Sequence, residues 1–140
     1  MDGMLIITFA IVLVLGGVLL ALISFTRGGS KRYLDVEKYR VKWLAIEQSL
    51  VEDQEASHHL ALLNADKLLD HALKERGFKG NTMGERMKSA QKNWSNANHT
   101  WAAHKLRNRI AHEAEVRVSL DMTRKALGAF KQALKDVGAI

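Results

Sequence analysis

Residues 4–25 read MLIITFAIVLVLGGVLLALISF, a stretch without a charged side chain in which only Thr8 and Ser24 are polar. A helix of this length measures about 33 Å, enough to cross the hydrocarbon core of a bilayer, which is about 30 Å thick. The remaining residues are too few to bury every face of such a helix in a soluble core. A cleaved signal peptide fits less well, because no basic residue precedes the run and the run is longer than usual. The sequence predicts a transmembrane anchor at residues 1–26.

Basic residues flank this segment on one side only. Asp2 precedes the apolar run, whereas the residues that follow it include Arg27, Lys31, Arg32, Lys38, Arg40 and Lys42. The positive-inside rule places such a flank in the cytoplasm. We therefore expect a single-pass protein of the cell membrane, with its N-terminus outside and its C-terminal domain in the cytoplasm.

The composition of the chain favours helices and excludes thiol chemistry. The 140 residues include no Cys and no Pro, and 21 Lys and Arg stand against 15 Asp and Glu. Without Cys there are no disulfides, Cys-ligated zinc sites, iron–sulfur centres or thiol catalysts. Since Ala, Leu, Lys and Glu are abundant and β-branched residues are few after the apolar run, we expect helices rather than a sandwich or barrel.

Apolar residues recur at helical spacing through the rest of the chain. Gly28–Ser30 marks a short break, after which a stripe containing Tyr39, Trp43 and Ile46 predicts a juxtamembrane helical stalk over 27–56. No Pro or Gly interrupts the sequence as far as Gly77, so we expect one long helix there, or two that are nearly continuous.

Residues 57–140 are predicted to form a helical domain. Thr82 and Glu85 have the spacing of a capping box, a further helix is expected over about 97–113, and Ser119 is a candidate N-cap for the last helix. The predicted fold class is all-α, with one N-terminal transmembrane helix followed by a bundle of four or five helices.

The segment 101–113, WAAHKLRNRIAHE, combines residue types that suit phosphate chemistry. On a helix, His104, Asn108 and His112 lie four residues apart on one polar side, and Arg107 lies at its boundary. A histidine can transfer a proton near neutral pH, and an arginine can hold two phosphate oxygens. These groups suit attack by an RNA 2′-hydroxyl on its adjacent phosphate, with the developing charge stabilised by Arg107.

The string RNRIAH, residues 107–112, resembles the Arg-x4-His motif of the HEPN superfamily, including the polar residue directly after the Arg. HEPN domains are small all-α bundles, and members with this motif include metal-independent endoribonucleases that generally act as dimers. The resemblance implies a HEPN-like domain and a homodimer, with Arg107 and His112 as the catalytic pair and Asn108 supporting them.

Neighbouring residues on the same predicted helix complete the candidate site. We expect His104, Lys105, Arg109 and Trp101 to contact the substrate, the basic side chains by attracting RNA and the indole by stacking on a base. No metal or other cofactor is predicted, because His104 and His112 are too far apart for a helical chelate and no Gly-rich phosphate loop is present.

Two other interpretations stay open at the level of sequence. The domain could be a non-catalytic module that holds RNA, a nucleotide or a protein partner at the membrane, since HEPN members without enzymatic activity exist. Alternatively, the polar stripe could be a hydrogen-bonded seam between two copies of the chain. These interpretations predict different results. A ribonuclease turns RNA over, whereas a binding module shows salt-sensitive binding without turnover. If the stripe is a seam between two copies, replacing His112 weakens self-association and nothing else.

Overall fold

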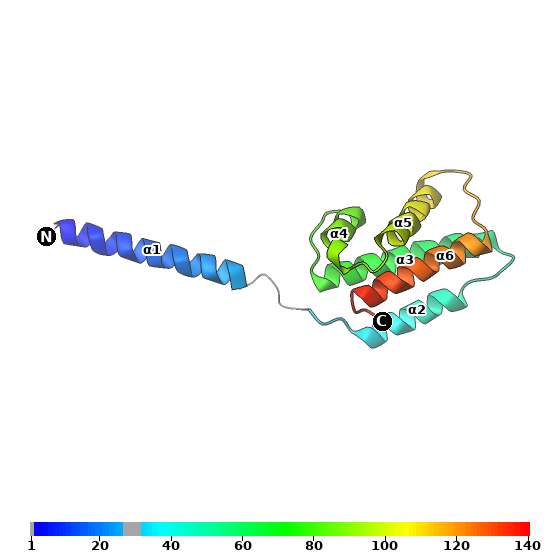
Figure 1. The fold of residues 1–140 in the computed structure, drawn as a ribbon, viewed down its shortest axis with the longest axis horizontal. Helices are drawn as coiled ribbons and strands as arrows, with labels where there is room; N and C mark the ends of the chain where they lie inside the picture. Colours follow the sequence, from blue (N-terminus) through cyan, green and yellow to red (C-terminus); the bar gives the residue numbers. More distant parts are fainter. Residues whose placement is uncertain (1, 27–31) are drawn as a thin grey trace. The chain divides into compact units, whose positions relative to one another are not determined.

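The computed structural model describes residues 2–26 and 32–140, and it divides into two compact units, residues 1–31 and 32–140. The predicted break at Gly28–Ser30 and the basic residues Arg27 and Lys31 lie outside the described residues. Every regular element in the described ranges is helical, as the composition predicts (Figure 1).

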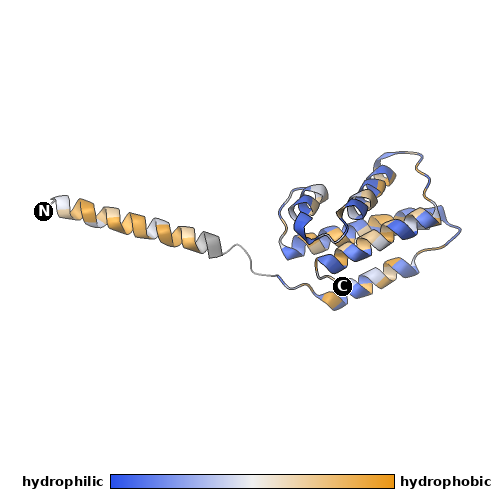
Figure 2. Ribbon diagram, in the orientation of Figure 1, coloured by the Kyte–Doolittle hydropathy of each residue, from blue (hydrophilic) through white to orange (hydrophobic). Residues whose placement is uncertain are grey.

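The first unit consists of the helix α1, Asp2–Thr26. Its residues 3–22 form a helix long and apolar enough to cross a membrane (Figure 2), and none of their side chains is buried. A core helix of a soluble protein would be largely buried, so this exposure agrees with the predicted anchor.

The second unit is a bundle of five α-helices. These are α2 (Val36–Gln48), α3 (Glu55–Arg76), α4 (Met83–Ser89), α5 (Ala97–His112) and α6 (Leu120–Asp136), with the 3₁₀ turn η1 (Gln91–Asn93) after α4. Helices α3 and α6 pack along each other at the centre, α2 covers them on one side, and α4 and α5 cover them on the other (Figure 1). The core contains seven residues of α3, among them Leu62, Leu69 and Leu73, and Phe130 of α6.

Local sequence signals start and stop these helices. Asp35, Asn96 and Ser119 cap α2, α5 and α6 by accepting a backbone N–H with their side chains. The Thr82–Glu85 capping box is present at the start of α4, as predicted. Helix α3 ends at Gly77, whose φ of 87° lies in the left-handed region that favours glycine.

The fold differs from the sequence prediction in the first half of the bundle. Helix α2 is not part of a stalk: Tyr39, Trp43 and Ile46 are buried in the core that α3 and α6 form. Nor do α2 and α3 form a nearly continuous helix, because residues 49–54 reverse the chain and α2 packs against α3 (Figure 1). Burial of the α2 stripe provides the physical reason, since a separate stalk would leave a Trp and a Tyr in water.

The turn between α2 and α3 is held by hydrogen bonds rather than by Gly or Pro. Ser57 accepts a hydrogen bond from the Val51 backbone N–H at 2.9 Å. The buried imidazole of His58 has its Nε2 3.1 Å from the carbonyl oxygens of Val51 and Glu52, and its Nδ1 3.0 Å from that of Val118. His58 thus links this turn to the α5–α6 loop.

Candidate functional site

A cleft of about 720 Å³ lies between α3, the start of α4, and α5. Arg107, Asn108, His104 and His112 of α5 all line it, together with Leu63, Asn64, Asp66, Lys67 and Asp70 of α3 and Thr82, Met83 and Gly84 at the start of α4. The three residues predicted as catalytic therefore converge on one accessible cavity within a single chain.

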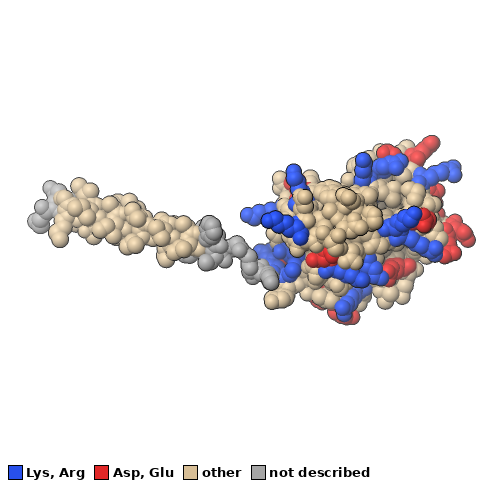
Figure 3. Space-filling model, viewed as in Figure 1, with Lys and Arg blue, Asp and Glu red and all other residues tan. Residues whose placement is uncertain are grey.

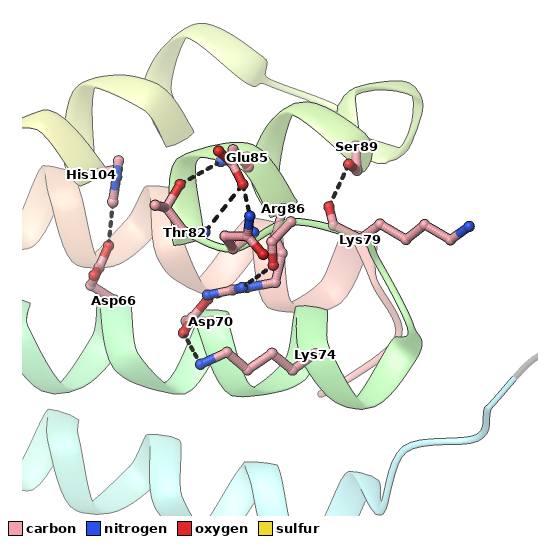
Figure 4. Close-up of polar contacts among 11 residues, drawn as sticks. Asp66, Asp70, Lys74, Lys79, Thr82, Glu85, Arg86, Ser89 and His104 are labelled. Carbon is pink, nitrogen blue, oxygen red and sulfur yellow. Dashed lines mark hydrogen bonds and ion pairs between the residues drawn. The ribbon is translucent and has the colours of Figure 1, made fainter.

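A buried carboxylate on α3 organises the floor of this cleft. Asp66 is 3% exposed, and its Oδ1 lies 2.7 Å from Nδ1 of His104 on α5 (Figure 4). A buried carboxylate is costly unless it is paired, so this contact fixes the position of the imidazole. His104, expected on the polar side of its helix, is in fact 9% exposed and faces α3.

Arg107 and Asn108 close a ring of contacts with this pair. The Arg107 Nη1 donates to Asn108 Oδ1 at 3.0 Å, and the Asn108 Nδ2 lies 3.2 Å from His104 Nε2. Arg107 Nε is 3.0 Å from Asp66 Oδ2, although its N–H is not directed at that oxygen, so this contact is electrostatic. One assignment of protons gives both nitrogens of His104 a hydrogen-bond partner. In it, His104 donates to Asp66 through Nδ1 and accepts from Asn108 through Nε2.

His112 stands apart from this ring. Its side chain is exposed at the C-terminal end of α5, and it makes no hydrogen bond or ion pair with the described residues. Both nitrogens of His104 are occupied, whereas those of His112 are free. Of the two histidines in the cleft, only His112 is therefore available to exchange a proton with a ligand.

The residues predicted to contact the substrate are not all in the cleft. Trp101 and Lys105 line a smaller hollow of about 360 Å³ beside it, which shares His104 and Asn108 with the main cleft. The Trp101 ring packs edge-on against His104, with centroids 6.1 Å apart. Arg109 lines neither cavity; its Nε pairs with Glu113 at 3.3 Å on the surface of α5.

One wall of the cleft depends on a second ion pair, in which the guanidinium is buried and the carboxylate half-buried. Arg86 of α4 is 6% exposed, and its Nε lies 2.7 Å from Asp70 Oδ1 while its Nη1 donates to the Gly80 carbonyl at 2.6 Å (Figure 4). Burial disfavours the charged form of Asp70, but the hydrogen bonds and charges of Arg86 and Lys74 outweigh it and lower the pKa of this carboxyl.

The backbone of the loop before α4 is fitted closely to this arrangement. Gly80 has a φ of 154°, and a Cβ at this position would lie 2.7 Å from the Arg86 backbone nitrogen. Only glycine fits there without a shift of the chain. The loop is thereby held where Thr82 and Gly84 can border the cleft.

Sequence reasoning missed Asp66, the central partner of the site. Its position held a signal, because Asp66 lies among the apolar residues of α3 that form the core face, between Leu62 and Leu69. An acidic residue on such a face implies a buried cationic or hydrogen-bonding partner. The identity of that partner, on a helix 38 positions later, depends on the tertiary fold.

Comparison of the chain with models of known protein families, with curated proteins and with solved structures gives no match.

Proposed function

We propose that the bundle is a membrane-anchored, HEPN-like endoribonuclease that cleaves RNA without a metal ion. The observation that carries this proposal is the convergence of Arg107, Asn108 and the unpaired imidazole of His112 on one cleft. A guanidinium held by a buried carboxylate and a free imidazole that line the same cleft suit charge stabilisation and proton transfer at a phosphodiester.

The proposed reaction begins with a 2′-hydroxyl of RNA bound in the cleft. His112 accepts the proton of this hydroxyl as its oxygen attacks the adjacent phosphorus, and the P–O5′ bond breaks as the new P–O2′ bond forms. The leaving 5′-oxygen takes up a proton from water, and His112 returns the proton it accepted to the solvent. Arg107 Nη2, which donates no hydrogen bond to the described residues, is available to hold a non-bridging oxygen whose charge grows in the transition state.

Asp66 and His104 act on this reaction through Arg107 and Asn108. Asp66 contacts both His104 and Arg107, so it keeps the guanidinium in one orientation before RNA binds. Such preorganisation lowers the cost of arranging charge at the moment of reaction. In this account His104 is a positioning residue, rather than the substrate contact that the sequence predicts.

Attraction of RNA requires positive charge that is not already neutralised. Within the cleft, Asp66 is paired with Arg107 and Asp70 with Arg86. Lys67 at the cleft and Lys105 at the neighbouring hollow form no ion pair with the described residues. We propose that these two lysines supply the electrostatic attraction, whereas Arg109, occupied by Glu113, contributes little.

The membrane topology and the dimer belong to the same proposal. The apolar helix α1 and the basic residues after it support an anchor in the cell membrane with the bundle in the cytoplasm, where RNA is present. The exposed face of α5, which carries Trp101, Lys105 and His112, is the face through which we expect two copies to associate.

The test is an RNA cleavage assay on residues 32–140 in the presence of EDTA. Every buried apolar residue among those described lies between Leu34 and Ala139, so this fragment contains its own complete core. We expect cleavage of single-stranded RNA that persists in EDTA. Absence of cleavage over a panel of structured and unstructured RNAs would contradict the enzymatic proposal.

A binding module without catalysis is the second candidate function. It is favoured if the fragment binds RNA or a nucleotide in a salt-sensitive manner and leaves it intact. The interpretation as a dimer seam has less support, because His104 and Asn108 already find their partners within one chain.

A further inference from the structure

The charges of the bundle are separated between its two ends. Residues 32–40, 74–96 and 131–140 meet at one end, which we call the basic end. Arg76 Nη1 donates to the Arg32 carbonyl at 3.0 Å, Lys38 pairs with Glu75 at 3.1 Å, and the Ser95 N–H donates to Asp136 at 2.8 Å. The basic end contains eleven Lys and Arg against five Asp and Glu.

The opposite end has the reverse balance. Residues 49–59 and 109–125 meet there, through the Arg124–Glu52 pair at 2.7 Å and the hydrogen bond from the Val118 N–H to Glu55 at 2.7 Å. These segments contain four Lys and Arg against six Asp and Glu. Glu47, near the end of α2, instead pairs with Lys131 of the basic end at 2.6 Å. On the face that Figure 3 draws, basic side chains gather at one end of the bundle, and acidic side chains lie among basic ones toward the other end.

Several cations of the basic end are free to bind an anionic partner. Lys79, Lys88 and Lys92 are exposed and form no ion pair with the described residues, and the same holds for Arg40 and Lys135. They come from three separate segments of the chain, 32–40, 74–96 and 131–140, so only the folded bundle gathers them. Lys79, Lys88 and Lys92 line neither the cleft nor the neighbouring hollow, so a broad anionic surface can reach them without entering a cavity.

Residue 32, at which the chain enters the bundle from α1, belongs to the basic end. Five residues, 27–31, connect α1 to residue 32, and a chain of this length spans at most about 22 Å. If α1 crosses the membrane, the basic end is the part of the bundle that the chain ties to the bilayer. The cytoplasmic leaflet is anionic and attracts Lys and Arg that lie within about a Debye length.

We infer that the basic end of the bundle binds the anionic lipid headgroups of the membrane in which α1 is anchored. This binding holds the bundle in a preferred orientation, with its acidic end directed away from the lipid. The inference rests on the predicted span and does not depend on RNA cleavage.

The test uses residues 32–140 and sedimentation with vesicles of phosphatidylcholine, with or without phosphatidylserine. We expect binding only to vesicles with phosphatidylserine, and loss of that binding as NaCl is raised to about 0.5 M. Each Lys near an anionic surface strengthens binding about fivefold. The triple variant Lys79→Gln, Lys88→Gln and Lys92→Gln should therefore bind about 100-fold more weakly.

The matched control removes the same number of charges from the opposite end. Arg117→Gln, Arg124→Gln and Lys125→Gln together should change the affinity less than about threefold, because these side chains lie beyond a Debye length from the lipid. Equal losses in the two triple variants, equal binding to neutral vesicles, or binding to RNA but not to vesicles would each overturn the inference.

Discussion

Replacing His112 by Ala is expected to lower the rate of RNA cleavage about 10²- to 10⁴-fold, the usual contribution of a general acid or base. The same change should leave the free energy of unfolding within about 0.5 kcal/mol, because the side chain is exposed and makes no hydrogen bond or ion pair with the described residues. Cleavage kinetics and urea unfolding of the 32–140 fragment measure the two effects.

His99→Ala provides the matched control for this variant. His99 is exposed on the same helix, but it lies in neither the cleft nor the neighbouring hollow. Its removal should leave cleavage within about twofold, since it contributes no group to the proposed chemistry. Equal loss of activity in the two variants would show that α5 as a whole, rather than the imidazole of His112, is required.

Asp70→Ala is expected to destabilise the bundle by about 3–5 kcal/mol, because it leaves the guanidinium of Arg86 buried without its carboxylate. The pKa of Asp70 is lowered in the folded state, so its stabilising effect is present above the unfolded pKa of about 3.9. That effect is lost as the pH falls through the folded pKa. Urea unfolding should therefore give the largest difference near neutral pH and a shrinking one below about pH 4.

Two further variants distinguish the cost of leaving a buried charge unpaired from the cost of losing an exposed ion pair. Glu52→Ala removes the exposed partner of Arg124, and its cost should not exceed about 1 kcal/mol. Combining Asp70→Ala with Arg86→Met also removes the buried guanidinium, so this double variant should recover most of the lost stability. A cost below about 1 kcal/mol for Asp70→Ala alone would mean that Arg86 finds another partner or water.

The helices could be predicted from sequence wherever their signals are local. The capping box at Thr82, the N-cap at Ser119 and the glycine stop at Gly77 each act within a few residues, and the structure contains all three. The reversal after α2 could not be predicted in this way. It depends on His58, which reaches a carbonyl 60 positions later in the chain.

The candidate site also combines residues that local sequence patterns identify with one that only the tertiary fold brings in. Arg107, Asn108 and His112 lie within six residues of one helix, so their pattern could be recognised without the fold. Asp66 joins them only because α3 packs beside α5, and no spacing rule connects it to His104. Arg109 shows a related effect: its charge counts as basic in the sequence, but its Nε lies 3.3 Å from Glu113 one turn later, and it lines neither cavity.

The chemistry of the RNA ends tests the proposed reaction most directly. Attack by the 2′-hydroxyl must leave a 2′,3′-cyclic phosphate on one product and a 5′-hydroxyl on the other. We predict that the 32–140 fragment yields these ends in EDTA and that His112→Ala does not, as read by mass spectrometry of the products. Products with a 3′-hydroxyl and a 5′-phosphate, or intact RNA with the wild-type fragment, would contradict the account.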